Sequence, residues 1–157
     1  MKDITSLVVD LLASTVKKRR AAAVELGKSG NLSAIGPLAA AFSDPHPAVR
    51  SDIAQALGRL GDSDAVPTLI TALSDPEPGI RCAAISALGK IKDLAAVSPL
   101  IGCLKDKDMT VRIGAAEVLG KLHDPSAIEP LTALLHDPFS EVREAAETAI
   151  KKLQSRA

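Results

Sequence analysis

Aromatic residues are almost missing from this sequence: its 157 residues include two phenylalanines and no tryptophan or tyrosine. The hydrophobic content of 46% therefore rests on Ala, Leu, Ile and Val. Such residues suit closely packed helices better than β-strands, which are enriched in aromatic residues. Proteins that stack nucleic-acid bases on aromatic side chains also need what this sequence lacks. The composition predicts an all-α fold and argues against nucleic-acid binding by stacking.

The sequence also lacks an excess of charge of either sign. Nineteen basic and nineteen acidic residues give a formal net charge of zero, which offers no general attraction to nucleic acid or to an acidic membrane. The two cysteines, Cys82 and Cys103, form neither a disulfide framework nor a metal-binding spacing, as is typical of a reducing compartment. The start does not resemble a secretory leader, and no apolar run is long enough to cross a bilayer. We therefore expect a cytoplasmic protein that does not bind membranes.

One pattern recurs every 31 residues along the sequence. Its most regular column is basic and consists of Arg19, Arg50, Arg81, Arg112 and Arg143. A second column consists of Leu26, Leu57, Leu88, Leu119 and Ile150, with glycine directly after the four leucines. Five units account for nearly all of the chain. We expect one domain, 1–157, with repeats at approximately 1–30, 31–61, 62–92, 93–123 and 124–157.

Each unit has the pattern of two short helices. In the third unit, apolar residues at helical spacing predict helix A over about 64–74 and helix B over about 79–88, ending at Gly89. Helices of this length are marginal alone, so neighbouring pairs must stack to cover their apolar faces. The predicted fold class is an all-α, right-handed superhelix, or solenoid, of five two-helix repeats. Lys18 and Lys151 replace an apolar residue and a glycine in the end units, which we interpret as polar caps.

The repeated residues resemble a known family. The run Asp-Pro-x-x-x-Val/Ile-Arg-x-x-Ala-x-x-Ala-Leu-Gly, followed by Asp-x-x-Ala-Val/Ile-x-Pro-Leu, is similar to the short HEAT-like repeats first described in phycobilisome lyases. It covers all five units, most faithfully from Asp44 to Ile150. The resemblance implies that helix A lies on a convex face and helix B on a concave face. It also implies a protein partner, with an accessory subunit of a bilin-chromophore lyase as the alternative function.

The arginine column has two possible roles. An aspartate precedes the arginine by six residues in four units, as Asp44/Arg50, Asp75/Arg81, Asp106/Arg112 and Asp137/Arg143. A row of arginines can bind phosphate or carboxylate groups of a ligand. Alternatively, each aspartate caps helix B and each guanidinium ties adjacent units together. We favour the structural role, because the pair occurs in every Asp-Pro unit whatever else varies.

A second basic column lies at the predicted C-terminal end of helix B: Lys28, Arg59, Lys90, Lys121 and Lys152. A cation at this position interacts favourably with the helix dipole. The same side chains would form a basic edge that could meet an acidic partner. Nucleic-acid binding through this edge is the least favoured alternative, because the rest of the composition does not support it.

Positions that vary between repeats are the best candidates for partner recognition. Two columns of helix B should face outward, since the apolar core uses other positions. The first outward column is Arg20, Ser51, Cys82, Ile113 and Glu144, and the second is Val24, Gln55, Ser86, Glu117 and Thr148. Cys82 and Ile113 stand there without an evident core role, which is typical of a small recognition patch. Together with Arg59, Lys90 and Lys121, these columns except Val24 form the predicted partner-binding surface. Ordinary variation of an exposed surface would give a similar pattern.

No pattern predicts catalysis, a cofactor or a metal site, and we expect a non-catalytic scaffold. His46, His123 and His136 lie in predicted turns and none is followed by glutamate, unlike the His-Glu pairs of HEAT-type di-iron hydroxylases. Cys82 is either a reactive thiol next to Arg81 or a small residue on a helix surface. We expect Cys103 in the core, whereas Phe139 is either tucked under the last helix or exposed to a partner.

Charge is distributed unevenly along the chain. Residues 1–30 contain six basic and three acidic residues, a net charge of +3, and residues 123–157 contain four basic and six acidic residues, a net charge of −2. We expect a monomer, and these opposite charges would permit weak head-to-tail association.

Overall fold

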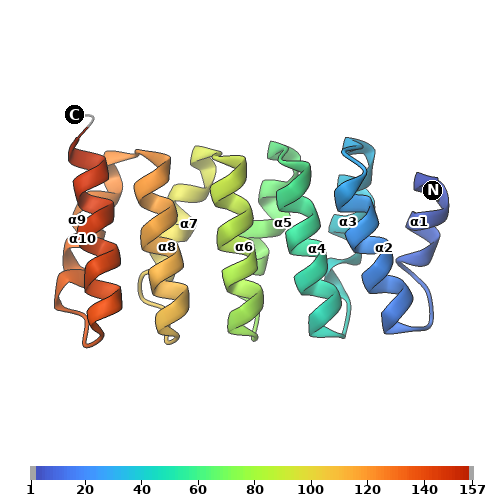
Figure 1. The fold of residues 1–157 in the computed structure, drawn as a ribbon, viewed down its shortest axis with the longest axis horizontal. Coiled ribbons are helices and arrows are strands. Elements are labelled where there is room, and N and C mark those ends of the chain that lie inside the picture. The colour runs from blue at the N-terminus through green and yellow to red at the C-terminus, as the bar shows by residue number, and fades with distance from the viewer. Residues whose placement is uncertain (1–2, 156–157) are drawn as a thin grey trace. The chain divides into compact units, whose positions relative to one another are not determined.

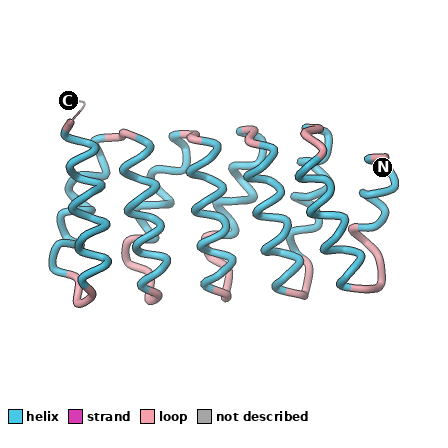
Figure 2. Tube along the Cα trace, in the orientation of Figure 1, coloured by secondary structure: helices cyan, strands magenta, loops and turns pink. Residues whose placement is uncertain are grey.

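Regular structure in this protein is helical throughout residues 3–155, which are the residues that the computed structural model describes. Ten α-helices and six one-turn 3-10 helices follow one another in this part of the chain, joined by short loops (Figures 1 and 2). The predicted all-α repeat fold is confirmed. The chain divides into two compact units, Met1–Ile91 and Lys92–Ala157, which are described separately. The single domain expected from the sequence stays a prediction.

The first unit contains three helix pairs. Its A helices are α1 (Ile4–Asp10), α3 (Ile35–Ala40) and α5 (Val66–Ala72), and its B helices are α2 (Val16–Lys28), α4 (Pro47–Leu60) and α6 (Pro78–Ile91). The 3-10 helices η1 (Leu32–Ala34), η2 (Ala41–Ser43) and η3 (Ser63–Ala65) extend the second and third A helices. Helix α4 packs between α2 and α6, and each A helix packs on the B helix that follows it. The B helices of this unit therefore form a row.

The second unit contains two helix pairs of the same kind. Its A helices are α7 (Val97–Cys103) and α9 (Ile128–Ala133), and its B helices are α8 (Met109–Leu122) and α10 (Ser140–Gln154). The 3-10 helices η4 (Leu94–Ala96), η5 (Pro125–Ala127) and η6 (Leu134–His136) flank the A helices. Helix α8 packs against α10, and α7 and α9 pack on α8 and α10 respectively.

The leucine column of the sequence forms the core of both units. Leu26, Leu57, Leu88 and Leu119 are 0% exposed, and the leucines of the A helices, Leu38, Leu69, Leu100 and Leu131, are also 0% exposed. Cys103 is buried, as the sequence predicted. Within residues 3–155 no helix has the length and apolar character needed to cross a membrane.

The predicted end of helix B at glycine is wrong. Helix α6 continues past Gly89 to Ile91, and Gly58 lies inside α4. A Cβ atom placed on Gly58 would lie 2.6 Å from the Cβ atom of Ala87 in the neighbouring B helix, and one on Gly27 would lie 2.6 Å from the Cα atom of Ala56. Real Cβ atoms do not approach other atoms so closely. The glycines therefore permit close contact between B helices, and left-handed residues further on, such as Gly61 at φ 72°, form the turn.

A forked ion pair joins successive repeats within each unit. Arg50 donates from Nε to Oδ2 of Asp75 at 2.7 Å and from Nη2 to Oδ1 at 3.1 Å, while its Nη1 donates to the backbone carbonyl of Asp44 at 2.9 Å. The guanidinium therefore ties its own turn to the turn of the next repeat. The same fork joins Arg19 to Asp44 and Arg112 to Asp137.

The structural role predicted for the Asp and Arg columns is correct, but the pairing and the cap differ from expectation. The carboxylates of Asp44, Asp75 and Asp137 each pair with the arginine 25 residues before them, and the arginine six residues after them donates to the backbone carbonyl of the aspartate instead. Asp44 does not cap helix α4, because the N-cap is His46. Instead, Oδ1 of Asp44 accepts the backbone N–H of His46 at 2.8 Å and closes the turn.

Ionisation of these carboxylates depends on the fork. Burial of Asp75, which is 8% exposed, would raise the pKa of its carboxyl group. Hydrogen bonds from Arg50 and from the backbone N–H of Glu77 outweigh this effect of burial and leave the pKa of Asp75 below its usual value. For Asp137 the hydrogen bond from Arg112 is the main cause of a lowered pKa. The folded chain therefore keeps these aspartates charged.

The last helix differs at two positions. Lys151 stands where the other B helices have glycine, and its Nζ atom lies 2.8 Å from Oε1 of Glu147. A lysine at this position prevents another helix from approaching α10 as closely as α10 approaches α8. Phe139, at the N-cap of α10, is 46% exposed, and the guanidinium carbon of Arg112 lies 5.8 Å from its ring centroid. Its ring therefore covers part of the last Arg–Asp pair.

Replacing Gly58 with alanine should destabilise the chain although alanine favours helices. We expect the free energy of unfolding to fall by about 1–3 kcal/mol, because the new methyl group must push the backbone at Ala87 away. The matched control is Gly36→Ala in α3, where a Cβ atom meets nothing within 4 Å and helix propensity should give about 0.5–1 kcal/mol of stabilisation. Urea unfolding followed by circular dichroism measures both. Equal effects of the two substitutions would contradict the close-contact role.

Removing one partner of the fork should be costly. Arg50→Met leaves the buried carboxylate of Asp75 without its ion pair, and we expect the free energy of unfolding to fall by about 3 kcal/mol or more. Lys151→Met is the control, because it breaks a pair whose side chains are 72% and 59% exposed and should cost about 1 kcal/mol or less. Urea unfolding of the two variants gives the comparison.

The difference in stability between the wild type and Arg50→Met should depend on pH. Because the pKa of Asp75 is lower in the folded than in the unfolded chain, its stabilising contribution is complete above the unfolded value of about 3.9 and is lost as pH falls through the folded value. Wild-type stability should therefore decline below about pH 4, and its advantage over Arg50→Met should shrink. An advantage that stays constant down to pH 3 would show that the carboxylate charge is not involved.

Candidate functional site

Each unit has an open groove between two neighbouring B helices. In the first unit a groove of about 330 Å³ lies between α4 and α6, and in the second a groove of about 510 Å³ lies between α8 and α10. Both are lined by the columns of helix B that the sequence marks as variable and outward-facing. The two grooves are therefore the candidate functional site.

Helical spacing explains why these residues share a face. Ile113, Glu117 and Lys121 follow one another at intervals of four on α8, which places them on one side of the helix. Val111 and Leu119, on another face of the same helix, are 0% exposed and belong to the core. Residues 31 positions further on, Glu144, Thr148 and Lys152, occupy the corresponding face of α10.

The groove of the first unit, the α4–α6 groove, is small and mostly uncharged. Ser51 and Gln55 come from α4, and the amide Nε2 of Gln55 lies 3.4 Å from Oγ of Ser51. Cys82 is partly exposed, and it lines the groove from α6 together with Ser86 and Lys90. Gly79, Ala83 and Ala87 complete the lining, so the surface here consists of short side chains with one lysine at its edge.

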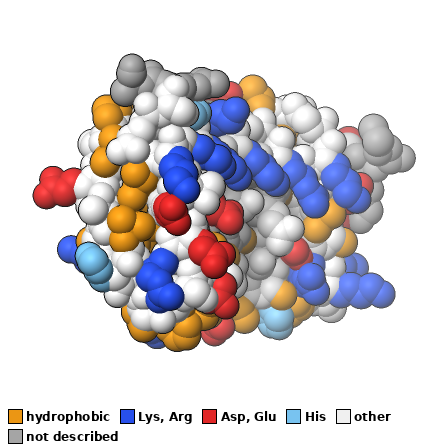
Figure 3. All heavy atoms as spheres, turned by 60° about the vertical axis from the view of Figure 1, so that its left-hand side comes forward, with side chains coloured by type: hydrophobic (Ala, Val, Ile, Leu, Met, Phe, Trp, Pro, Cys, Tyr) orange, Lys and Arg blue, Asp and Glu red, His pale blue; other side chains and the backbone are white. Residues whose placement is uncertain are grey.

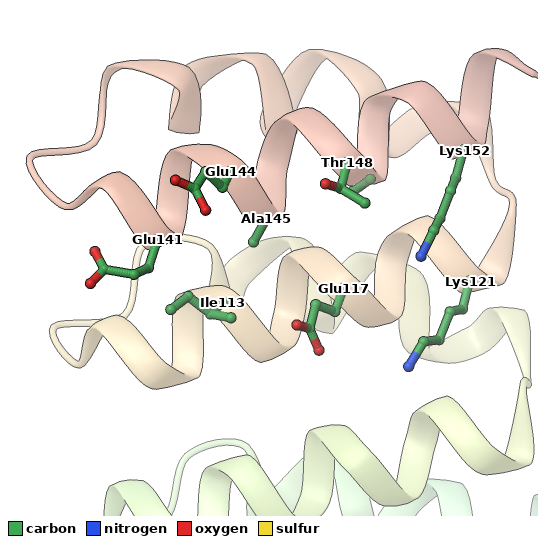
Figure 4. A pocket seen from close by; sticks show the side chains of 9 residues that line it. Ile113, Glu117, Lys121, Glu141, Glu144, Ala145, Thr148 and Lys152 are labelled. Carbon is green, nitrogen blue, oxygen red and sulfur yellow. The ribbon is translucent and has the colours of Figure 1, made fainter.

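The groove of the second unit, the α8–α10 groove, is strongly charged and its charges are segregated. Glu117 comes from α8, and Glu144 from α10. Lys121 and Lys152 lie together toward the C-terminal ends of the two helices, with Ile113 and Ala145 between the helices at the acidic end (Figure 4). On the forward side of Figure 3, a group of acidic side chains lies between basic side chains above and below it.

Ten of the twelve predicted partner-binding residues line these two grooves. They are Ser51, Gln55, Cys82, Ser86 and Lys90 in the first unit, and Ile113, Glu117, Lys121, Glu144 and Thr148 in the second. The other two, Arg20 and Arg59, line neither. Nε of Arg20 lies 2.6 Å from Oδ2 of Asp52, so its charge is already paired, and Arg59 is an exposed residue in the last turn of α4.

Four lining residues of the α8–α10 groove were outside the predicted surface: Glu141, Ala145, Ala149 and Lys152. Glu141 could have been found, because it precedes Glu144 by one helical turn on the same face. Lys152 belongs to the basic column, all of whose members lie in the last turn of a B helix as predicted.

A further cavity, which the sequence did not indicate, lies beside α1 and α2. Its volume is about 480 Å³, and Ile4 and Leu7 line it together with Glu25 and Lys28. Lys28 and Glu25 form an ion pair at 3.0 Å, so the basic column is neutralised here. Close to this cavity in sequence, Val9 and Leu12 are 66% and 83% exposed.

The three histidines have local structural positions. His46 is the N-cap of α4 and accepts the backbone N–H of Ala48 at Nδ1, His123 is the left-handed residue after α8, and His136 ends η6. Among residues 3–155 there is no group of three or more His, Cys, Asp or Glu side chains arranged to hold a metal ion.

Comparison with known proteins identifies the repeat. The family model of HEAT repeats matches residues 5–77 and 66–151. No curated protein sequence matches the chain. The fold is similar to the complex of CpcE and CpcF of phycocyanin lyase from Nostoc sp. PCC7120, with a TM-score of 0.84 and 29% identity over 99% of this chain and 66% of that chain. This chain thus spans just under two-thirds of the length of that relative.

Engineered repeat proteins share the fold at lower identity. An engineered protein has a TM-score of 0.72 and 22% identity over 99% of this chain and 81% of its own. A computationally designed armadillo repeat protein for modular peptide recognition has a TM-score of 0.68 and 18% identity over 96% of this chain and 82% of its own. The helix pairs, their 31-residue period and the two matches to the family model lead to one conclusion: the chain belongs to the HEAT-repeat family.

Proposed function

We propose that this protein is a cytoplasmic, non-catalytic interaction module that binds a protein partner through the grooves between its B helices. The observation that carries the proposal is the separation of two sets of residues. The repeated leucines and arginines are occupied with stacking, whereas eight residues that vary between units line the two open grooves, together with Lys90 and Lys121 of the basic column.

The repeated arginines are unsuited to ligand binding. The guanidinium groups of Arg50 and Arg112 each make two hydrogen bonds to a carboxylate and two to backbone carbonyls of their own turn. Their donors are therefore used within the protein. The charged residues of the α8–α10 groove are different: within residues 3–155, Glu117, Lys121, Glu144 and Lys152 form no ion pair and are exposed. They are the charges that remain available to a partner.

The comparison with the phycocyanin lyase complex supports a protein partner, because that relative is itself one of two associated chains, CpcE and CpcF. The designed armadillo protein supports only the fold, since its identity to this chain is 18%. The same comparison favours a second candidate function. At 29% identity and a TM-score of 0.84, the chain could be an accessory subunit of a bilin-chromophore lyase, acting on a bilin attached to a protein.

Ile113→Asp should abolish capture of the partner without unfolding the chain. Ile113 is only partly buried and lines the α8–α10 groove, so a charge there disturbs the surface and leaves the core intact. We expect the partner recovered by affinity capture from the source organism, quantified by mass spectrometry, to fall by roughly tenfold or more, which corresponds to about 1.4 kcal/mol.

Leu94→Asp is the matched control, because Leu94 is an equally large apolar residue in the same unit, is 58% exposed and lies outside the groove. Capture should be retained in this variant, and circular dichroism should show both variants folded. Unchanged capture by Ile113→Asp, or equal loss in the two variants, would refute the groove as the binding site.

A bilin distinguishes the two candidate functions. An interaction module without a chromophore role should leave the visible absorption spectrum of a free bilin unchanged on mixing. A new or shifted band that saturates at one bilin per chain, and that disappears in the Ile113→Asp variant, would establish the lyase-accessory function instead.

A further inference from the structure

The α8–α10 groove has a charge pattern that fits one class of peptide. We propose that it binds an extended segment of the partner in which a lysine or arginine and an aspartate or glutamate lie three or four residues apart. This inference rests on the proposed function and adds the chemistry that the partner must present.

The acidic end of the groove suits a long basic side chain. Glu141 and Glu144 lie at this end on α10, and Glu117 lies on α8 between Ile113 and Lys121, as Figure 4 shows. Between the two helices, near Glu141 and Glu144, Ile113 and Ala145 are partly buried and offer an apolar floor. A lysine or arginine side chain packs its aliphatic stem on apolar surface while its charged head meets carboxylates. An acidic cluster without the floor would attract any cation, whereas this arrangement fits a basic side chain.

The basic end of the groove suits a carboxylate. Lys121 and Lys152 occupy corresponding positions in the last turns of α8 and α10. Two other exposed lysines of the B helices, Lys28 and Lys151, are each paired with a glutamate of their own helix, Glu25 and Glu147. Neither groove lysine forms such a pair within residues 3–155. Two adjacent ammonium groups are therefore left for an acidic side chain of the partner.

Helix geometry sets the spacing of the two charges. Glu144, at the acidic end, and Lys152 are eight positions apart on α10, which corresponds to about 12 Å along a helix. An extended chain advances about 3.3 Å per residue, so a peptide lying along the groove covers this distance in three or four residues. The backbones of two residues next to each other in an extended chain are about 3.3 Å apart, well short of this distance, so we expect such a pair to engage both ends less well.

The α4–α6 groove shows that the charge pattern is not a consequence of the repeat. At the same column positions it carries Ser51, Gln55, Cys82 and Ser86, and Lys90 is the charged residue of its lining. Equivalent positions thus form an uncharged surface in one unit and a bipolar surface in the other. A partner that recognises segregated charges would select the second unit.

The experiment is an NMR titration of the full ¹⁵N-labelled chain with short peptides of fixed composition. Two peptides carry one lysine and one glutamate four positions apart in a Gly/Ser/Ala background, one in each order, and a third carries the two residues side by side. We expect the better of the spaced peptides to shift the amides of α8 and α10, and to bind at least about threefold more tightly than the third.

Charge variants test the assignment of each end. Lys121→Glu with Lys152→Glu should weaken the better spaced peptide by about three- to tenfold, and replacing its glutamate with lysine should restore binding. Lys90→Glu in the α4–α6 groove is the matched control and should change the affinity less than twofold. The inference is overturned if spacing makes no difference, if the shifts lie in α4 and α6, if the charge swap gives no recovery, or if no peptide shifts the spectrum.

These outcomes are separable from those of the capture experiment. If partner capture is lost in Ile113→Asp while no peptide binds, the interaction function stands and the proposed peptide chemistry is wrong. If the peptides bind as expected while capture is unaffected by Ile113→Asp, the groove recognises the charge pattern but is not the docking site of the captured partner.

Discussion

A guanidinium held between two turns is the interaction on which stacking depends in both units. Arg50 fixes its own turn by hydrogen bonds to two carbonyls and fixes the next repeat by a bidentate contact to Asp75. Burying two charges is costly, and the cost is offset because the guanidinium makes four hydrogen bonds and the Asp75 carboxylate accepts three. The same arrangement recurs at Arg19 and Arg112, so the most regular charged column of the sequence is committed to structure.

Close contact between B helices follows from a second constraint and creates the site. Where glycine lacks a Cβ atom, as at Gly58 and Gly120, the next helix B approaches until its alanine touches the backbone. Helices packed in this way present their outward residues in adjacent rows, and the space between two rows is a groove. Function can then vary with the outward residues alone, as the uncharged α4–α6 groove and the bipolar α8–α10 groove illustrate.

Periodicity predicted the helix pairs, the leucine core and most of the groove lining, because each of these depends only on which face of a helix a residue occupies. It could not choose between partners for the arginines. Arg50, Arg81 and Arg112 each have an aspartate 6 residues before them and another 25 residues after them, so the repeat offers two equally regular partners. Nor could it tell a glycine that ends a helix from one that admits a neighbour. The ion pair of Arg20 with Asp52 could not be predicted either, because both residues lie at positions that vary between repeats.

Backbone hydrogen exchange of the chain, alone and in complex with its captured partner, tests the central claim most directly. The account predicts that binding slows exchange in B helices that line the grooves, most strongly in α8 and α10, and leaves the A helices of the same repeats, α7 and α9, close to their rates in the free chain. Protection confined to α7 and α9, with α8 and α10 unchanged, would show that the partner binds elsewhere and that the variable columns of helix B do not select it.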